Sequence, residues 1–118
     1  MLLVVSGLPG TGKTTLADSL AGRLRAVRVS VDPVEEALLE SGLPRSWESG
    51  AAAYRAGAAM AATNLAGGLP VVADAVNDSV AARAATYEAW TGPDHVHLDA
   101  TAPPTELVDR VLALLRGR

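Results

Sequence analysis

Apolar residues recur along this chain with two different periods, and the two periods predict two kinds of element. Short runs rich in Val, Leu and Ala end in turn residues or in aspartate, which is typical of strands buried in a parallel sheet. Between these runs, apolar residues recur every three or four positions, which is the period of an amphipathic helix. The predicted strands cover residues 1–6, 26–32, 69–75 and 95–100.

The helix ends are predicted from residues with known capping preferences. In the second helix, Asp32 occupies the N-cap and Pro33 the first helical position. Glu35 stands at the capping-box position of the same helix, and Gly42 marks its stop. Helices are predicted over residues 13–24, 32–41, 48–66, 79–90 and 103–118.

The alternation of strands and helices predicts an α/β fold with at most four strands. A chain of 118 residues is long enough for one core of modest size, and no linker or composition shift marks a boundary within it. We therefore predict a single domain over residues 1–118. Since Phe is absent, the core must be built from Leu, Val and Ala. Trp47 and Trp90 would line a pocket or, as we predict, act as packing residues.

Composition and charge argue against several classes of function. The net charge is −3 and no run of Lys or Arg forms a basic patch, so we expect no nucleic-acid partner. Cysteine is absent, which excludes disulfides and cysteine-based zinc sites. No apolar stretch reaches the length of a membrane span, and the N-terminal run is too short for a signal-peptide core. We expect a cytoplasmic chain without a membrane partner.

Residues 7–14 carry the spacing G-x-x-x-x-G-K-[ST] between a predicted strand and a predicted helix. Glycines let consecutive backbone N–H groups point at one anion, and the helix N-terminus adds a positive dipole end. Lys13 would reach the β- and γ-phosphates of a nucleotide, and the Thr14 hydroxyl would bind Mg²⁺. The predicted phosphate-binding residues are Gly7, Leu8, Pro9, Gly10, Thr11, Gly12, Lys13, Thr14 and Thr15.

Three further residues are candidates for chemistry beside this loop. Asp74 ends an apolar strand, where it would hold Mg²⁺ or orient its waters, or be an ordinary turn aspartate. Asp32 follows another strand; it would accept a proton from an acceptor hydroxyl, cap its helix, or do both. Arg83 would steady phosphate charge or lie solvated on its helix. We predict Lys13, Asp32 and Arg83 as catalytic residues and Thr14 and Asp74 as metal ligands.

The chain resembles the small P-loop kinases grouped with the chloramphenicol phosphotransferase and zeta-toxin-like families, often labelled AAA-family ATPases. The resemblance rests on three stretches: VVSGLPGTGKTTLA, VSVDPVEEAL and AAMAATNLAGGLPVVADAVND. It implies a P-loop NTPase three-layer sandwich with a small, mostly parallel sheet. It also implies Mg-ATP as donor and phosphoryl transfer to a hydroxyl of a small-molecule acceptor. By position, Asp32 matches the general base of such kinases, and Asp74 matches the acidic residue ending the strand beside the P-loop.

The chain departs from that family after Asp74. Only about twenty residues separate Asp74 from the strand predicted at 95–100, which leaves room for one helix and its turns. We therefore expect a fold shortened in its C-terminal third, without the family's helical lid and without one strand. A missing strand would leave a sheet edge that a second copy of the chain would cover, giving a homo-oligomer.

Three hypotheses about function remain open at this point. The first is an ATP-dependent kinase acting on a small hydroxyl compound. The second is a nucleotide-binding module or slow NTPase, because loss of a lid arginine typically lowers the rate of phosphoryl transfer by a factor of about 10³ or more. The third is a degenerate kinase fragment, whose incomplete sheet would fold poorly and expose apolar surface. No motif in the sequence identifies the acceptor.

Overall fold

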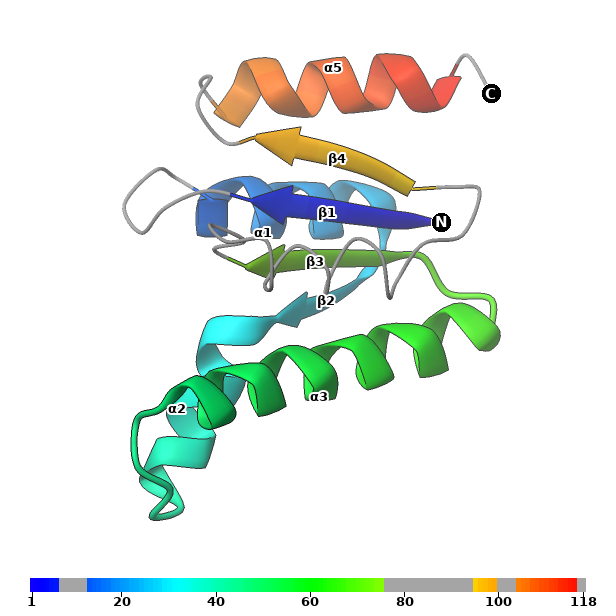
Figure 1. Cartoon of the computed structure of the whole chain (residues 1–118). Helices are drawn as coiled ribbons and strands as arrows, with labels where there is room; N and C mark the ends of the chain where they lie inside the picture. Colours follow the sequence, from blue (N-terminus) through cyan, green and yellow to red (C-terminus); the bar gives the residue numbers. More distant parts are fainter. Residues whose placement is uncertain (7–12, 76–94, 100–103, 117–118) are drawn as a thin grey trace.

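A four-stranded parallel sheet forms the centre of the protein (Figure 1). The computed structural model describes residues 1–6, 13–75, 95–99 and 104–116. The strands lie in the order β2-β3-β1-β4, so that β1 pairs with β3 on one side and with β4 on the other. The strands are β1 (Leu2–Ser6), β2 (Val27–Ser30), β3 (Val71–Ala75) and β4 (His95–Asp99).

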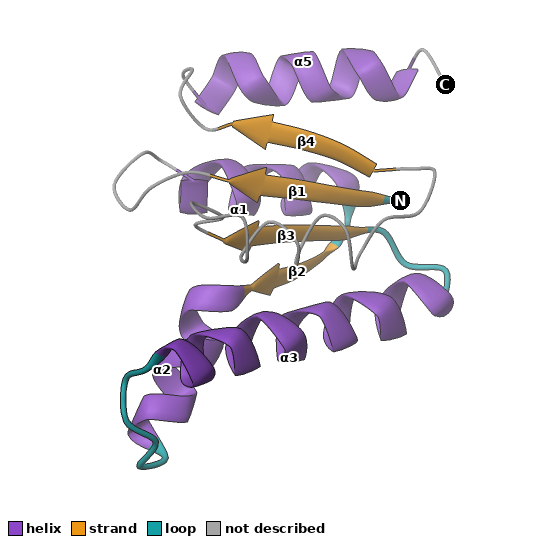
Figure 2. Cartoon of the chain, viewed as in Figure 1, coloured by secondary structure: helices purple, strands orange, loops and turns teal. Residues whose placement is uncertain are grey.

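Helices cover both faces of this sheet, which gives the three layers of an α/β sandwich (Figure 2). One face packs against α1 and α5, and the other packs against α2 and α3. The helices are α1 (Lys13–Leu24), α2 (Val31–Glu40), α3 (Trp47–Ala66) and α5 (Pro104–Arg116). In the part of the chain that the structure describes, the α/β class and the parallel sheet are confirmed.

Alternation along the strands divides the core into two clusters, because successive side chains of a strand point to opposite faces. Leu3 and Val5 of β1 face α1 and α5, whereas Leu2 and Val4 face α2 and α3. The first, called the α1–α5 cluster, contains Leu3, Val5, Leu16, Ala17, Leu20, Val72, Val108 and Val111. The second, called the α2–α3 cluster, contains Leu2, Val4, Val29, Val31, Ala53, Ala61, Val71, Ala73 and Ala75. As the absence of Phe predicts, these clusters consist of Leu, Val and Ala.

The start of α2 differs from the prediction. The N-cap is Ser30 and the helix begins at Val31, so Asp32 lies inside the first turn and is not the cap. Val31 is 2% exposed and packs in the α2–α3 cluster, which places the helix start directly after the strand. Glu35, predicted for a capping box, is instead paired with Arg45. The predicted stop is confirmed, since the helix ends just before Gly42, whose φ of 102° favours glycine.

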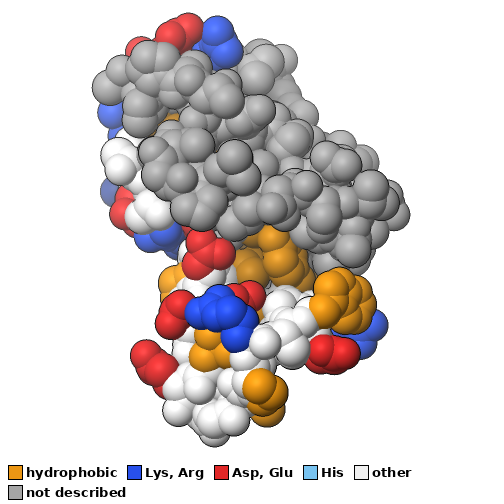
Figure 3. Space-filling model, turned by 60° about the vertical axis from the view of Figure 1, so that its left-hand side comes forward, with side chains coloured by type: hydrophobic (Ala, Val, Ile, Leu, Met, Phe, Trp, Pro, Cys, Tyr) orange, Lys and Arg blue, Asp and Glu red, His pale blue; other side chains and the backbone are white. Residues whose placement is uncertain are grey.

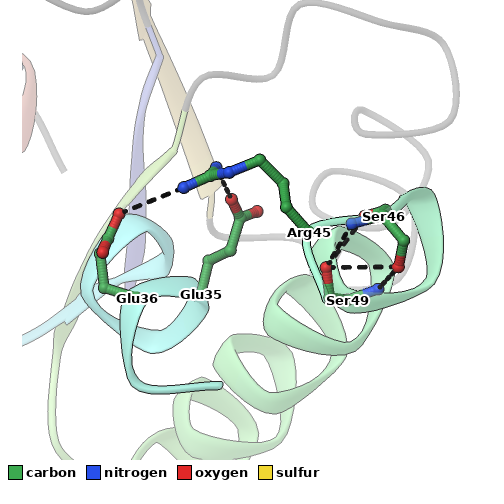
Figure 4. Close-up of polar contacts among 5 residues, drawn as sticks. All are labelled: Glu35, Glu36, Arg45, Ser46 and Ser49. Carbon is green, nitrogen blue, oxygen red and sulfur yellow. Dashed lines mark hydrogen bonds and ion pairs between the residues drawn. The ribbon is translucent and has the colours of Figure 1, made fainter. Parts of the chain in front are cut away.

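The corner between α2 and α3 is held by polar contacts of two kinds (Figure 4). Arg45 Nη1 lies 3.0 Å from Glu35 Oε1, and Arg45 Nη2 lies 3.7 Å from Glu36 Oε1. Ser46 caps α3 by accepting a hydrogen bond from the backbone N–H of Ser49, while the Ser49 hydroxyl accepts one from the backbone N–H of Ser46. The capping box fixes where α3 begins, and the exposed ion pairs add little stability.

Two packing predictions have different outcomes. Trp47 is 73% exposed at the start of α3, so its prediction as a packing residue is wrong. Val111 of α5, by contrast, is buried in the α1–α5 cluster, in keeping with the amphipathic helix predicted over residues 103–118. The helix predicted over 79–90, which includes Trp90, lies outside the described residues. In the ranges that the structure does describe, no helix is long and apolar enough to cross a membrane.

We expect Leu20→Ala to lower the free energy of unfolding by about 2–5 kcal/mol. Leu20 is fully buried between α1 and the sheet, so its truncation removes apolar contacts and leaves a cavity. Urea unfolding measures the change. Leu43→Ala is the control, because Leu43 is 48% exposed and its truncation is expected to change stability by at most about 0.5 kcal/mol. Equal losses in the two variants would contradict this description of the core.

Candidate functional site

The carboxyl ends of β1, β2 and β3 bring together the residues that precede the phosphate loop and the two candidate aspartates. In the parallel register, Val5 pairs with Asp74, and Ser30 pairs with Asp74 from the other side. Asp74 therefore lies one strand away from the point where the chain leaves the sheet toward Gly7. This is the edge at which open α/β sheets bind their ligands.

Asp74 is buried at this edge and is contacted by β2. Its side chain is 1% exposed. The Ser30 hydroxyl donates a hydrogen bond to Asp74 Oδ2 over 3.1 Å, and Arg28 Nε lies 3.5 Å from Asp74 Oδ1. A carboxylate removed from water is costly unless it is paired and hydrogen-bonded, so these β2 groups both stabilise and orient it.

Arg28 connects this carboxylate to the first helix. Val29 belongs to the α2–α3 cluster, so its neighbours Arg28 and Ser30 point to the opposite face, toward α1. There the Arg28 guanidinium also forms an ion pair and a hydrogen bond with Asp18 of α1. The Arg28 side chain is 28% exposed, whereas that of Asp18 is 60% exposed. One guanidinium therefore bridges an exposed carboxylate and a buried one.

An open pocket of about 560 Å³ lies between the start of α1, the end of β2 and α2. Thr14, Arg28 and Ser30 line one side of it. The α2 side carries Asp32, Pro33, Glu36, Ala37 and Glu40. The three acidic residues follow one another at intervals of four, which is the spacing of a single helix face. Figure 3 shows acidic side chains gathered on this side of the molecule, next to basic ones.

The predicted site residues are only partly placed by the structure. Thr14 and Asp32, predicted as metal ligand and general base, line the same pocket. Asp74 is buried and is not among the lining residues, but it contacts two of them, Ser30 and Arg28. Lys13 is the first residue of α1, and Thr15 follows on the same turn with an exposed side chain. The remaining predicted residues, Gly7, Leu8, Pro9, Gly10, Thr11, Gly12 and Arg83, lie outside the described residues.

Sequence reasoning missed Arg28, Ser30 and Asp18. The signal for the first two was present, because they occupy alternate positions of the strand predicted over residues 26–32 and must share a face. What the sequence did not supply was the partner strand, since the contact with Asp74 depends on β2 lying beside β3. Asp18 was missed because an acidic residue on a helix is usually solvated.

The residues at this edge fit a magnesium ion bound together with phosphates. Mg²⁺ typically takes one or two protein oxygens and completes its octahedron with water and phosphate oxygens. Thr14 and Asp74 supply a hydroxyl and a carboxylate, and Ser30 connects them because it lines the pocket with Thr14 and donates to Asp74. Among the described residues, no group of three or more His, Asp or Glu could hold a metal by itself. A metal here would need oxygens from a ligand.

Residues 2–113 match the model of a family described as AAA domain. No curated protein matches.

Solved structures of similar fold include several kinases. A sugar kinase from a Janibacter species is 18% identical with a TM-score of 0.70, over 98% of this chain and 94% of that one. A putative kinase from Chloroflexus aurantiacus is 28% identical with a TM-score of 0.67, over 98% and 66%. An APS kinase from Mycobacterium tuberculosis, in complex with AMPPNP and APS, is 23% identical with a TM-score of 0.61, over 92% and 66%. The fold is the α/β P-loop NTPase fold, as predicted.

We expect Ser30→Ala to lower the free energy of unfolding by about 1–3 kcal/mol, because it removes a hydrogen bond to a buried carboxylate. Chemical denaturation in urea measures the loss. Ser19→Ala on the exposed side of α1 is the control, with an expected change within about 0.5 kcal/mol. If Ser30→Ala were no more destabilising than Ser19→Ala, the hydrogen bond to Asp74 would not contribute to stability.

Proposed function

The chain belongs to the AAA domain family, and from this membership and the geometry of its site we propose that it is an ATP- and Mg²⁺-dependent kinase acting on a hydroxyl group of a small molecule. One observation carries the proposal. Thr14, from the phosphate-loop motif, and Asp32, the candidate base, line the same open pocket. A nucleotide phosphate held at the start of α1 would therefore lie near a carboxylate able to activate an acceptor.

The nucleotide side of the proposal rests on the loop motif and on the start of α1. The motif spans residues 7–14, and α1 begins at Lys13, so the unpaired N–H groups of its first turn would face a bound phosphate. We assign the β- and γ-phosphates to Lys13 and the backbone of residues 7–15. Arg83 is proposed as a further cation for the transferred phosphate. The kinases of similar fold, one of them with bound AMPPNP, support this assignment.

The metal side rests on Thr14 and Asp74. These two residues would hold Mg²⁺ beside the phosphates, where the ion would supply positive charge that lowers the repulsion felt by an attacking acceptor oxygen. The Thr14 hydroxyl would be a direct ligand. Asp74 is buried and does not line the pocket, so it would act on the metal ion through a water molecule and not as a direct ligand.

The transfer step requires one base and one acceptor hydroxyl. Asp32 would take the hydroxyl proton while the hydroxyl oxygen forms a bond to the γ-phosphorus. The bond between the γ-phosphorus and the β–γ bridging oxygen breaks, and ADP leaves with that electron pair. Asp32 suits this role because it follows β2 at the carboxyl edge and its side chain is exposed to the pocket.

A second function is favoured by the short interval between Asp74 and β4. The kinases that the sequence resembles insert a helical lid in that interval, and here fewer residues are available for one. Without such a lid the protein would be a nucleotide-binding module or a slow NTPase, with poor transfer to any acceptor. The two functions differ in whether ATP consumption depends on an acceptor.

We expect excess Mg-ATP to raise the melting temperature of the wild-type protein by several degrees. Ligand at about 100 times its Kd adds roughly 2.7 kcal/mol to stability, and Lys13→Ala should lose most of that gain because it removes the phosphate contact. Thermal unfolding with and without Mg-ATP measures both. Arg23→Ala, an exposed substitution near the end of α1, should keep the full shift. An equal shift in Lys13→Ala would place the nucleotide elsewhere.

We expect Asp32→Asn to lower acceptor-dependent ADP release by about 10²–10⁴-fold while leaving the Mg-ATP melting shift unchanged. The amide keeps the shape of the side chain but cannot take the proton. The assay is ADP release with a panel of sugars, polyols and amino alcohols. Glu35→Gln, on the same helix but outside the pocket lining, is the control and should retain the rate. ADP release that is independent of every acceptor, and equal in Asp32→Asn, would favour the NTPase.

A further inference from the structure

Arg28 is the residue at this edge that the proposed function leaves without a role. It comes from β2, faces α1, and lines the pocket together with Thr14. Its guanidinium lies beside Asp74 on one side and pairs with Asp18 on the other. A long side chain that meets two carboxylates is held in one place, because each contact restricts the same set of torsions.

The two contacts of Arg28 differ in how strongly water screens them. Asp18 is largely exposed, and water screens a pair of this kind. Asp74 is 1% exposed, so its negative charge must be met by protein groups whenever no other cation is present. Ser30 contributes a neutral donor, whereas Arg28 contributes a full positive charge within 3.5 Å. Arg28 therefore stands where a cation is needed and where a divalent metal ion would also be attracted.

We infer that Arg28 is a counter-cation for Asp74 in the protein without metal. It balances the buried charge of Asp74 before a metal ion arrives, and it thereby weakens the attraction of this sheet edge for free Mg²⁺. The inference rests on the proposed function only in assigning the metal to Asp74. Mg²⁺ held by nucleotide phosphates would meet Asp74 through water, as proposed above, and need not displace Arg28, whereas Mg²⁺ alone would have to compete with Arg28 for the carboxylate. Arg28 is thus a positioning residue that acts through Asp74.

The test compares the response of several variants to MgCl2 in the absence of nucleotide. Arg28→Met removes the charge and keeps the apolar part of the side chain. Asp74→Asn, alone and combined with Arg28→Met, removes the carboxylate that the arginine serves. Arg45→Met is the matched control, since Arg45 also pairs with two carboxylates but lies on the exposed α2–α3 corner. NaCl at equal ionic strength corrects for general salt effects.

We expect Arg28→Met to lower the melting temperature by roughly 5 °C or more, because a buried carboxylate loses the positive charge that lies 3.5 Å from it. MgCl2 should restore part of this loss and raise the melting temperature at least twice as far as it does in the wild type. The double variant should melt higher than Arg28→Met alone and show no added response to Mg²⁺. Arg45→Met should differ little from the wild type in both respects.

Two results would overturn the inference. One is an Mg²⁺ response in Arg28→Met no larger than in the wild type, which would leave Arg28 a structural partner only. The other is a loss of stability that Asp74→Asn does not offset, which would attribute the loss to packing and not to charge. If Arg28→Met fails to fold, the double variant decides, since it should fold when charge is the cause and fail when packing is.

Failure of the inference can be told apart from failure of the proposed function. The variants above are measured with Mg²⁺ alone, whereas the kinase proposal depends on the Mg-ATP shift and on acceptor-dependent turnover. If Mg-ATP does not raise the melting temperature of the wild type while MgCl2 raises that of Arg28→Met, the kinase proposal is wrong and the inference about Arg28 stands. If Mg-ATP raises the melting temperature of the wild type while Arg28→Met responds to MgCl2 no more than the wild type does, the kinase proposal stands and the inference about Arg28 is wrong.

Discussion

Asp74 brings a carboxylate to the end of an interior strand, where its side chain is 1% exposed, and a charge so placed must be met by hydrogen bonds and by opposite charge. β2 provides both. Val27 and Val29 of this short strand pack toward α2 and α3, and the alternate positions Arg28 and Ser30 turn toward Asp74. The strand therefore contributes to the core with one face and to the polar edge with the other.

The order of the strands makes this arrangement possible. β3 lies between β1 and β2, so Asp74 has Val5 on one side and Ser30 on the other. β1 leads into the phosphate-loop motif and α1, which returns across the face toward which Asp74 and Arg28 point. The start of α1 and Arg28 thus line one pocket, and Arg28 also contacts the buried carboxylate of Asp74, although these residues are distant in sequence. A different strand order would separate Ser30 from Asp74 and remove this hydrogen bond to the buried carboxylate.

The elements could be predicted from the sequence because the signals for them are local. A period of two or of about four, a glycine after a helix and the spacing of residues 7–14 are all read within one short window. The prediction failed where a helix start or a side-chain contact depends on residues that are distant in the sequence. The burial of Val31 in the core places the start of α2 before Asp32, and the role of Arg28 depends on a strand more than forty residues away.

The open pocket bears on the choice between transfer and hydrolysis. Thr14, Asp32, Glu36 and Glu40 all line it with exposed side chains, so in the part of the chain that the structure describes water reaches the place where an acceptor would lie. Water is also a hydroxyl nucleophile, and in the proposed mechanism the base Asp32 would activate it as readily as an alcohol. An acceptor that fills the pocket displaces that water and presents its hydroxyl at high effective concentration. Whether ATP consumption depends on an acceptor is therefore the property that distinguishes a kinase from an NTPase at this site.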